Sequence, residues 1–84
     1  MPYAYRPEVL DTLLAHGFRP TPDTPPDFVR ESLSGLYRHE IRRLRARLLR
    51  KEFPRREYAG RVDTLRRRYV LLKVPVALWT LEAP

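Results

Sequence analysis

The sequence predicts an all-α fold of three helices: a long basic antiparallel hairpin, a short N-terminal helix and an extended apolar C-terminal tail. Three observations support this prediction. Apolar residues recur every three or four positions through two long segments, which places them on one side of an α-helix. Leucine, arginine, alanine and glutamate, all good helix formers, fill both segments. Neither segment alternates apolar and polar residues every two positions, as a half-buried strand would. We expect the 84 residues to form one small domain.

The first helix is predicted at residues 7–16. Pro7 suits a first helical turn, and Gly17 is a suitable helix stop because glycine takes the left-handed conformation without steric penalty. Residues 19–25 follow as a proline-rich connector with no helical or strand pattern. The apolar side of this helix is formed by Val9, Leu10, Leu13 and Leu14.

The hairpin is predicted at residues 26–51 and 54–72. Pro54 separates the two helices, and it costs little in a first turn because its missing N–H would have no intrahelical partner there. A short connection between two amphipathic helices implies an antiparallel pair. The core expected from these stripes is Leu10, Leu13, Leu14, Phe18, Val29, Leu33, Ile41, Leu44, Leu48, Phe53, Tyr58, Val62, Leu65 and Tyr69.

The C-terminal segment, residues 73–84, is apolar and is predicted to be extended. Pro75 excludes it from a central strand and from a helix interior. The segment has two alternative places, against the helices of its own chain or against another chain, because an apolar terminus is not expected to stay solvated. A tryptophan flanked by aliphatic residues is a common interface anchor. The candidate interface residues are Val76, Leu78, Trp79 and Leu81.

Positive charge is concentrated in the hairpin. The chain carries a net charge of +7, but residues 38–73 alone hold 14 basic and four acidic side chains, a net +10. Arginine binds phosphate oxygens with two hydrogen bonds at once, so one interpretation is a polyanion-binding face; the alternative is a solvated helix surface. The candidate polyanion-binding residues are Arg42, Arg43, Arg47 and Arg50 on the second helix, and Arg56, Arg61, Arg67 and Arg68 on the third.

No pattern of residues predicts catalysis. His39 and Glu40 are adjacent and point about 100° apart on a helix, so they do not form a same-face pair. No glycine-rich phosphate loop and no Gly-x-Ser-x-Gly turn is present. A metal site normally needs two or more ligands on one side of the fold, and no helical spacing supplies them. We therefore expect no enzyme activity, no cofactor, no metal and no small-molecule substrate.

Composition also restricts the environment in which the chain works. The sequence has no cysteine, so neither a disulfide nor a thiolate metal site stabilises it. The longest uncharged run, Val74 to Leu81, is eight residues and is too short to cross a bilayer. The first residues, MPYAYRPEVLDTLL, lack the basic start and apolar core of a signal peptide. We expect a soluble, cytoplasmic protein without membrane contact.

Part of the hairpin, RLRARLLRKEFPRREYAGRVDTL, resembles the SHOCT-type short helical hairpin found at the C-termini of many bacterial proteins. The resemblance covers about a quarter of the chain, and Lys51-Glu52 stand where that pattern usually has a glycine. It implies a helical interaction or oligomerisation module without a catalytic centre. The matching positions are Leu44, Leu48, Phe53, Pro54, Glu57 and Tyr58.

Two functional hypotheses follow from the sequence. In the first, the protein is a non-catalytic interaction or adaptor module that binds a protein partner or forms a homodimer. In the second, the arginine-rich face binds nucleic acid without reading its sequence. The second lacks an aromatic-rich strand for stacking RNA bases and a compact helix-turn-helix for the DNA groove.

Overall fold

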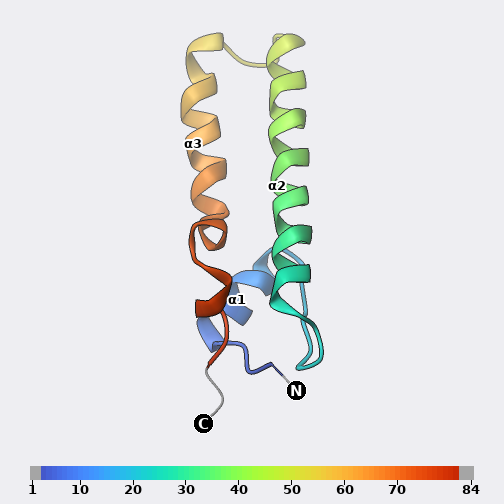
Figure 1. Cartoon of the computed structure of the whole chain (residues 1–84). Helices are drawn as coiled ribbons and strands as arrows, with labels where there is room; N and C mark the ends of the chain where they lie inside the picture. The colour runs from blue at the N-terminus through green and yellow to red at the C-terminus, as the bar shows by residue number, and fades with distance from the viewer. Residues whose placement is uncertain (1–2, 82–84) are drawn as a thin grey trace.

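The computed structural model describes residues 3–81, and three α-helices dominate this part of the chain (Figure 1). No β-strand occurs between residues 3 and 81; a lone antiparallel bridge joins Tyr5 to Thr80. The predicted all-α fold is confirmed. The elements in chain order are α1 (Pro7–Ala15), α2 (Pro26–Leu49), the 3-10 turn η1 (Arg55–Glu57), α3 (Tyr58–Arg68), and the 3-10 turns η2 (Val70–Lys73) and η3 (Val76–Leu78).

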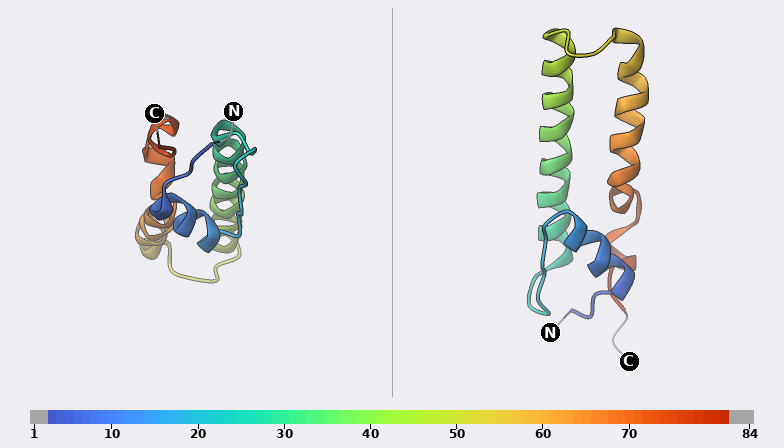
Figure 2. Two further views of the ribbon diagram at one scale, coloured as in Figure 1. Left: turned by 90° about the horizontal axis from the view of Figure 1, so that it is seen from below. Right: turned by 180° about the vertical axis from the view of Figure 1, so that it is seen from behind.

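Helices α2 and α3 run side by side in opposite directions, and α1 crosses one face of this pair at the end where both termini lie (Figures 1 and 2). The molecule extends 53 × 17 × 16 Å, and its radius of gyration is 15.5 Å. A compact chain of this length would have a radius of about 12 Å. We call the projecting part, residues 38–68, the arm, and the part around α1 the base.

Helix α1 ends in the turn that the sequence predicts. Gly17 has a φ of 86°, and its N–H donates to the Leu14 carbonyl at 2.9 Å. The Phe18 N–H donates to the Leu13 carbonyl, also at 2.9 Å. These are the two bonds of a Schellman motif, in which a left-handed residue allows the last helical carbonyls to be satisfied.

The same motif ends α2, but without a glycine. The N–H groups of Lys51 and Glu52 donate to the carbonyls of Leu48 and Arg47, at 2.9 Å and 3.1 Å. Lys51 takes the left-handed position, with a φ of 61°. The helix therefore ends at Leu49, before the predicted residue 51. A residue with a Cβ atom costs about 1–2 kcal/mol in this conformation.

Replacing Lys51 with glycine should therefore stabilise the chain by about 0.5–1 kcal/mol, because glycine takes a positive φ without steric cost. Chemical denaturation measures the effect. Lys51→Ala is the matched control, since it removes the same charge and keeps the Cβ atom. Equal stability of the glycine and alanine variants would contradict the explanation.

The third predicted helix, residues 54–72, is shorter than expected and flanked by tighter turns. Pro54 and η1 lead into α3, which ends at Arg68 because Tyr69 leaves the helical conformation, with φ −105° and ψ 36°. The chain continues as η2, and this change of direction brings Leu71 into the core, where it is 6% exposed.

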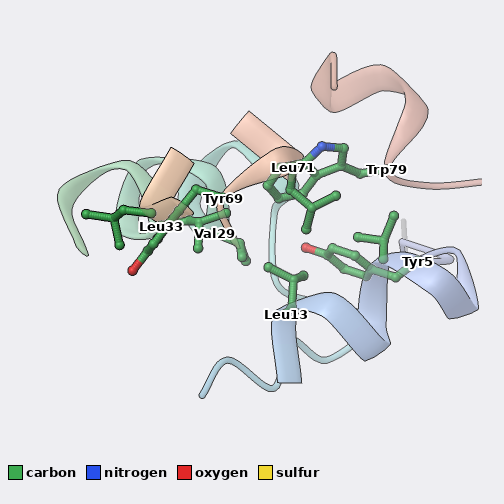
Figure 3. Close-up of a cluster of buried hydrophobic side chains, with 9 residues drawn as sticks. Tyr5, Leu13, Val29, Leu33, Tyr69, Leu71 and Trp79 are labelled. Atoms are coloured by element: carbon green, nitrogen blue, oxygen red, sulfur yellow. The ribbon is translucent and has the colours of Figure 1, made fainter. Parts of the chain in front are cut away.

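The main core lies in the base, where the two ends of the chain meet the helices, and Leu65 of the arm joins it (Figure 3). Of the predicted core, Leu13, Val29, Leu33, Leu65 and Tyr69 belong to it, and Leu44 and Phe53 are buried in the arm. The cluster also contains residues that the periodicity did not identify as core. The full cluster is Tyr5, Val9, Leu13, Val29, Leu33, Leu65, Tyr69, Leu71 and Trp79.

Some predicted core positions are wrong. Leu10 and Leu14 are 36% and 50% exposed, because α1 lies on one face of the hairpin and turns only Val9 and Leu13 inward. A pair of helices without a third partner leaves its apolar seam partly open, so Ile41, Leu48, Tyr58 and Val62 are only half-buried. Phe18, which follows α1, is also half-buried and packs against the core, as Ile41 does.

The prediction of an extended tail is also wrong for most of its described length. The tail forms η3, and Trp79 is completely buried, with its indole N–H donating to the Val74 carbonyl at 3.1 Å. The Trp79 carbonyl accepts a bond from the Arg6 N–H at 2.9 Å, which ties the tail to the N-terminal segment. Residues 82–84 of the predicted tail lie outside the described residues.

The candidate interface therefore needs correction at its central residue. Trp79 is a core residue of its own chain and is not an exposed anchor, because the two ends of the chain close over it. Val76 is half-buried and packs against the core. Leu78 and Leu81 remain exposed, at 53% and 49%.

Candidate functional site

The arm carries most of the charge of the protein. Residues 38–68 hold 13 basic and four acidic side chains, a net +9. Five of these arginines form ion pairs with carboxylates. Seven exposed arginines of the arm have no carboxylate within 4.0 Å among residues 3–81. They are Arg42, Arg43, Arg45, Arg55, Arg56, Arg66 and Arg68.

One face of the arm is hollowed between α2 and α3. We call this hollow the arginine groove. The buried side chains of Leu44 and Leu65, 8% and 9% exposed, form its floor. Arg43 and Arg47 lie four residues apart and therefore share one side of α2. The residues that line the groove are Glu40, Arg43, Leu44, Arg47, Leu65 and Arg68.

A second hollow extends the same face along α3, where it shares Leu65 and Arg68 with the arginine groove. Arg61 and Arg68 are seven residues apart, which is close to two helical turns, so both project to this side. Arg56 lies at the far end. The face thus has arginines from both helices around an apolar floor.

The eight candidate arginines do not form a single face. Arg43, Arg47, Arg61 and Arg68 line the groove or its extension, together with Arg56. Each of Arg42 and Arg67 is one residue, and therefore about 100° of helix rotation, away from a groove arginine. Arg67 instead pairs with Asp63 at 2.9 Å, and Arg50 lies at the tip with Glu52.

At the tip, one arginine of the groove and one of its extension are held in place around Phe53, which is 6% exposed. The guanidinium groups of Arg47 and Arg61 lie 5.6 Å and 4.2 Å from the centre of its ring, within the range of cation–π attraction. Glu52 accepts hydrogen bonds from Arg50 at 2.7 Å and from Arg47 at 3.2 Å. The bond from Arg50, with that from Arg47, lowers the pKa of the Glu52 carboxyl.

At the base, the groove ends at a polar cluster that sequence reasoning missed. His16, at the end of α1, donates from Nε2 to the Arg68 carbonyl at 2.7 Å, and its ring centre lies 4.4 Å from that of Tyr69. The Tyr69 hydroxyl donates to the Glu40 carboxylate. Burial raises the pKa of Tyr69 above its ordinary value of 10, and the Glu40 carboxylate raises it further. A tyrosine in this state stays protonated at neutral pH, which suits a structural hydrogen bond.

Replacing Tyr69 with phenylalanine should therefore weaken the dependence of stability on alkaline pH. Tyrosine in the unfolded chain ionises near pH 10 and Tyr69 in the folded chain only above that, so its stabilising effect is complete below pH about 10 and is lost as the pH rises further. The variant should lose about 1.5 kcal/mol at neutral pH, because a hydrogen bond to a carboxylate is removed.

Urea denaturation between neutral pH and pH about 11 tests this prediction. Burial also raises the pKa of Tyr5, but Tyr5 contributes equally to the pH dependence of the wild-type protein and of the Tyr69→Phe variant. The free energy of unfolding of the variant should fall less steeply with pH than that of the wild-type protein. Parallel curves would contradict a role for Tyr69.

Within the part of the chain that the structure describes, no three histidine or carboxylate side chains gather closely enough to hold a metal ion. No helix in that part has the length and apolar character needed to cross a membrane. Comparison of the chain with protein-family models, with curated proteins and with solved structures found no match.

Proposed function

We propose that this protein is a non-catalytic interaction module, working in the cytoplasm without a cofactor, whose arm binds an acidic surface of a partner protein. The observation that carries the proposal is the arginine groove, where an apolar floor is bordered by Arg43 of α2 and Arg68 of α3. Neither arginine has a carboxylate within 4.0 Å among residues 3–81.

The chemistry of the groove favours a protein over other polyanions. A protein surface offers carboxylates together with apolar side chains, and the groove provides complementary groups for both in Arg43, Leu44 and Leu65. A phosphate backbone supplies charge but no apolar side chains for the floor. Two arms with a net charge of +9 each repel one another, so a homodimer through this face is disfavoured. The exposed Leu78 and Leu81 remain candidates for self-association at the base.

Site-specific photo-crosslinking in cells tests the proposal. A benzoylphenylalanine residue at Thr64, an exposed position beside the groove, should form an adduct with a protein. Ala59 is a matched control position, because it is exposed on α3 and five residues, about 140° of rotation, from Thr64. Adducts at Thr64 that are equally strong at Ala59, or that contain only nucleic acid, would contradict the proposal.

Nucleic acid is the second candidate partner, and one observation supports it. Exposed arginines without a carboxylate within 4.0 Å in the described part of the chain occur outside the groove as well, at Arg42, Arg45, Arg55 and Arg66. This distribution is expected for contact with a charged backbone rather than with one pocket. An electrophoretic shift with duplex DNA and with RNA should then appear at about 50 mM salt and weaken with a log–log slope of about −0.9 per neutralised phosphate on DNA. Absence of a shift at low salt would remove this candidate.

A further inference from the structure

We propose that the occupant of the arginine groove is a single amphipathic helix of the partner, with an apolar stripe bordered by acidic residues, which packs on α2 and α3 as the third helix of a bundle. This inference rests on the proposed function and specifies the structural form of the partner. Helix α1 already occupies the corresponding place at the base.

The arm lacks one component of a closed helical bundle. Two antiparallel helices bury only the side chains directly between them, and in the arginine groove nothing in residues 3–81 covers the floor formed by Leu44 and Leu65. At the base, α1 closes the seam between the two helices, and its Leu13 is completely buried there (Figure 3). Beyond α1, no element of residues 3–81 crosses the same face (Figure 2, right).

The groove continues directly from the end of α1. The hollow beside α1 is lined by Thr12 and His16 as well as by Glu40 and Arg68. The arginine groove shares Glu40 and Arg68 with it, so the two hollows form one path along the face. A partner helix in this path would start beside the end of α1 and extend along the arm toward Phe53 at the tip.

The charges along this path specify the charge of the occupant. Arg43 and Arg47 border the path on α2, and Arg61 and Arg68 border it on α3. Arg47 already pairs with Glu52, and Arg61 pairs with Glu57, which also lines the path. Glu40 in the groove already accepts a bond from Tyr69. Carboxylates on the two sides of a partner stripe should therefore meet mainly Arg43 and Arg68, while its apolar residues contact Leu44 and Leu65.

The first part of the experiment uses two peptides of about 14 residues, long enough to cover about 21 Å as a helix. One is a helix-stapled peptide with leucines at i, i+3, i+4 and i+7 and glutamates on both sides of that stripe. The other has the same staple and composition in an order without a stripe. Fluorescence anisotropy at about 50 mM salt should show the striped peptide binding at least about tenfold more tightly, because only it places apolar groups on the floor.

The second part uses two charge-matched variants of the full chain. Arg43→Glu with Arg68→Glu reverses one groove arginine on each helix. Arg42→Glu with Arg66→Glu reverses two exposed arginines that do not line the groove, again one on each helix, with the same change in net charge. Affinity for the striped peptide should fall at least about tenfold in the groove variant and less than about threefold in the control. If circular dichroism shows either variant unfolded, the corresponding glutamine pair replaces it.

Each result decides between the hypotheses. Equal affinity for both peptides would contradict the proposal that an amphipathic helix occupies the groove. The proposed binding of an acidic protein surface would still stand. Equal losses in both variants would also contradict the helix in the groove, because binding would then depend on overall charge. If neither peptide binds while duplex DNA does, the proposed function fails as well. A dimer of the wild-type chain in sedimentation that the groove variant abolishes would make a second copy the occupant and overturn the proposal.

Discussion

Replacing Trp79 with alanine is expected to lower the free energy of unfolding by about 3–5 kcal/mol, the range for a buried aromatic residue. Trp79 is completely buried among residues from both ends of the chain. Its removal would leave a cavity in the cluster that Trp79 forms with Leu71 and Tyr5 (Figure 3). It would also remove the bond from the indole N–H to the Val74 carbonyl. This loss is a large fraction of the stability of a small domain.

Leu78→Ala is the matched control, because Leu78 precedes Trp79 and is 53% exposed. It should cost less than about 1 kcal/mol. Urea denaturation measures both losses, and sedimentation should show that Trp79→Ala does not change the assembly state. A loss below about 1 kcal/mol for Trp79→Ala would contradict the placement of the tail in the core of its own chain.

A second large effect is expected at Leu13, where alanine should cost about 2–5 kcal/mol. Leu13 is completely buried and belongs to the cluster that joins α1 to α2 and α3. Its neighbour Leu14 is 50% exposed, so Leu14→Ala should cost less than about 1 kcal/mol. The two substitutions remove identical atoms from adjacent positions of one helix, so helix propensity affects both equally.

Chemical denaturation measures the free energy of unfolding of the two leucine variants, and the difference between them reports which side of α1 is buried. Val9 points inward with Leu13, while Leu10 is 36% exposed on the side of Leu14. A greater loss at Leu14 than at Leu13 would mean that α1 is rotated about its axis relative to this structure. Equal losses above about 2 kcal/mol would mean that the outer side of α1 is covered in solution.

The helices themselves could be predicted well from the sequence. The three- and four-residue steps from Val29 to Leu48 and from Tyr58 to Leu72 are local properties, and they predicted both α2 and α3. The predicted third helix, residues 54–72, was too long at both ends, because the chain forms 3-10 turns before Tyr58 and after Tyr69. The stop at Gly17 was also predictable, since glycine tolerates a positive φ. The end of α2 was predicted two residues late, because Lys51 carries no sequence signal for the left-handed conformation that it adopts.

The candidate site was predictable in part. The concentration of arginines is visible in the sequence, and helical rotation separates Arg42 from Arg43. The sequence does not say how α2 and α3 are rotated relative to each other. Only their packing brings Arg43 and Arg47 to the same face as Arg68. The cluster of His16, Tyr69 and Glu40 was missed because these residues are far apart in the sequence and share no spacing rule.

The sequence by itself determined the all-α class, the approximate extent of the helices and the basic character of the hairpin, because these depend on residue type and on spacing within one helix. Only the tertiary structure decided which side of α1 is buried, that Trp79 belongs to its own core, and which arginines share a face. These outcomes depend on contacts between distant residues, such as the bridge from Tyr5 to Thr80. Periodicity identifies the apolar side of a segment, but the packing of several elements selects which apolar residues on that side are buried.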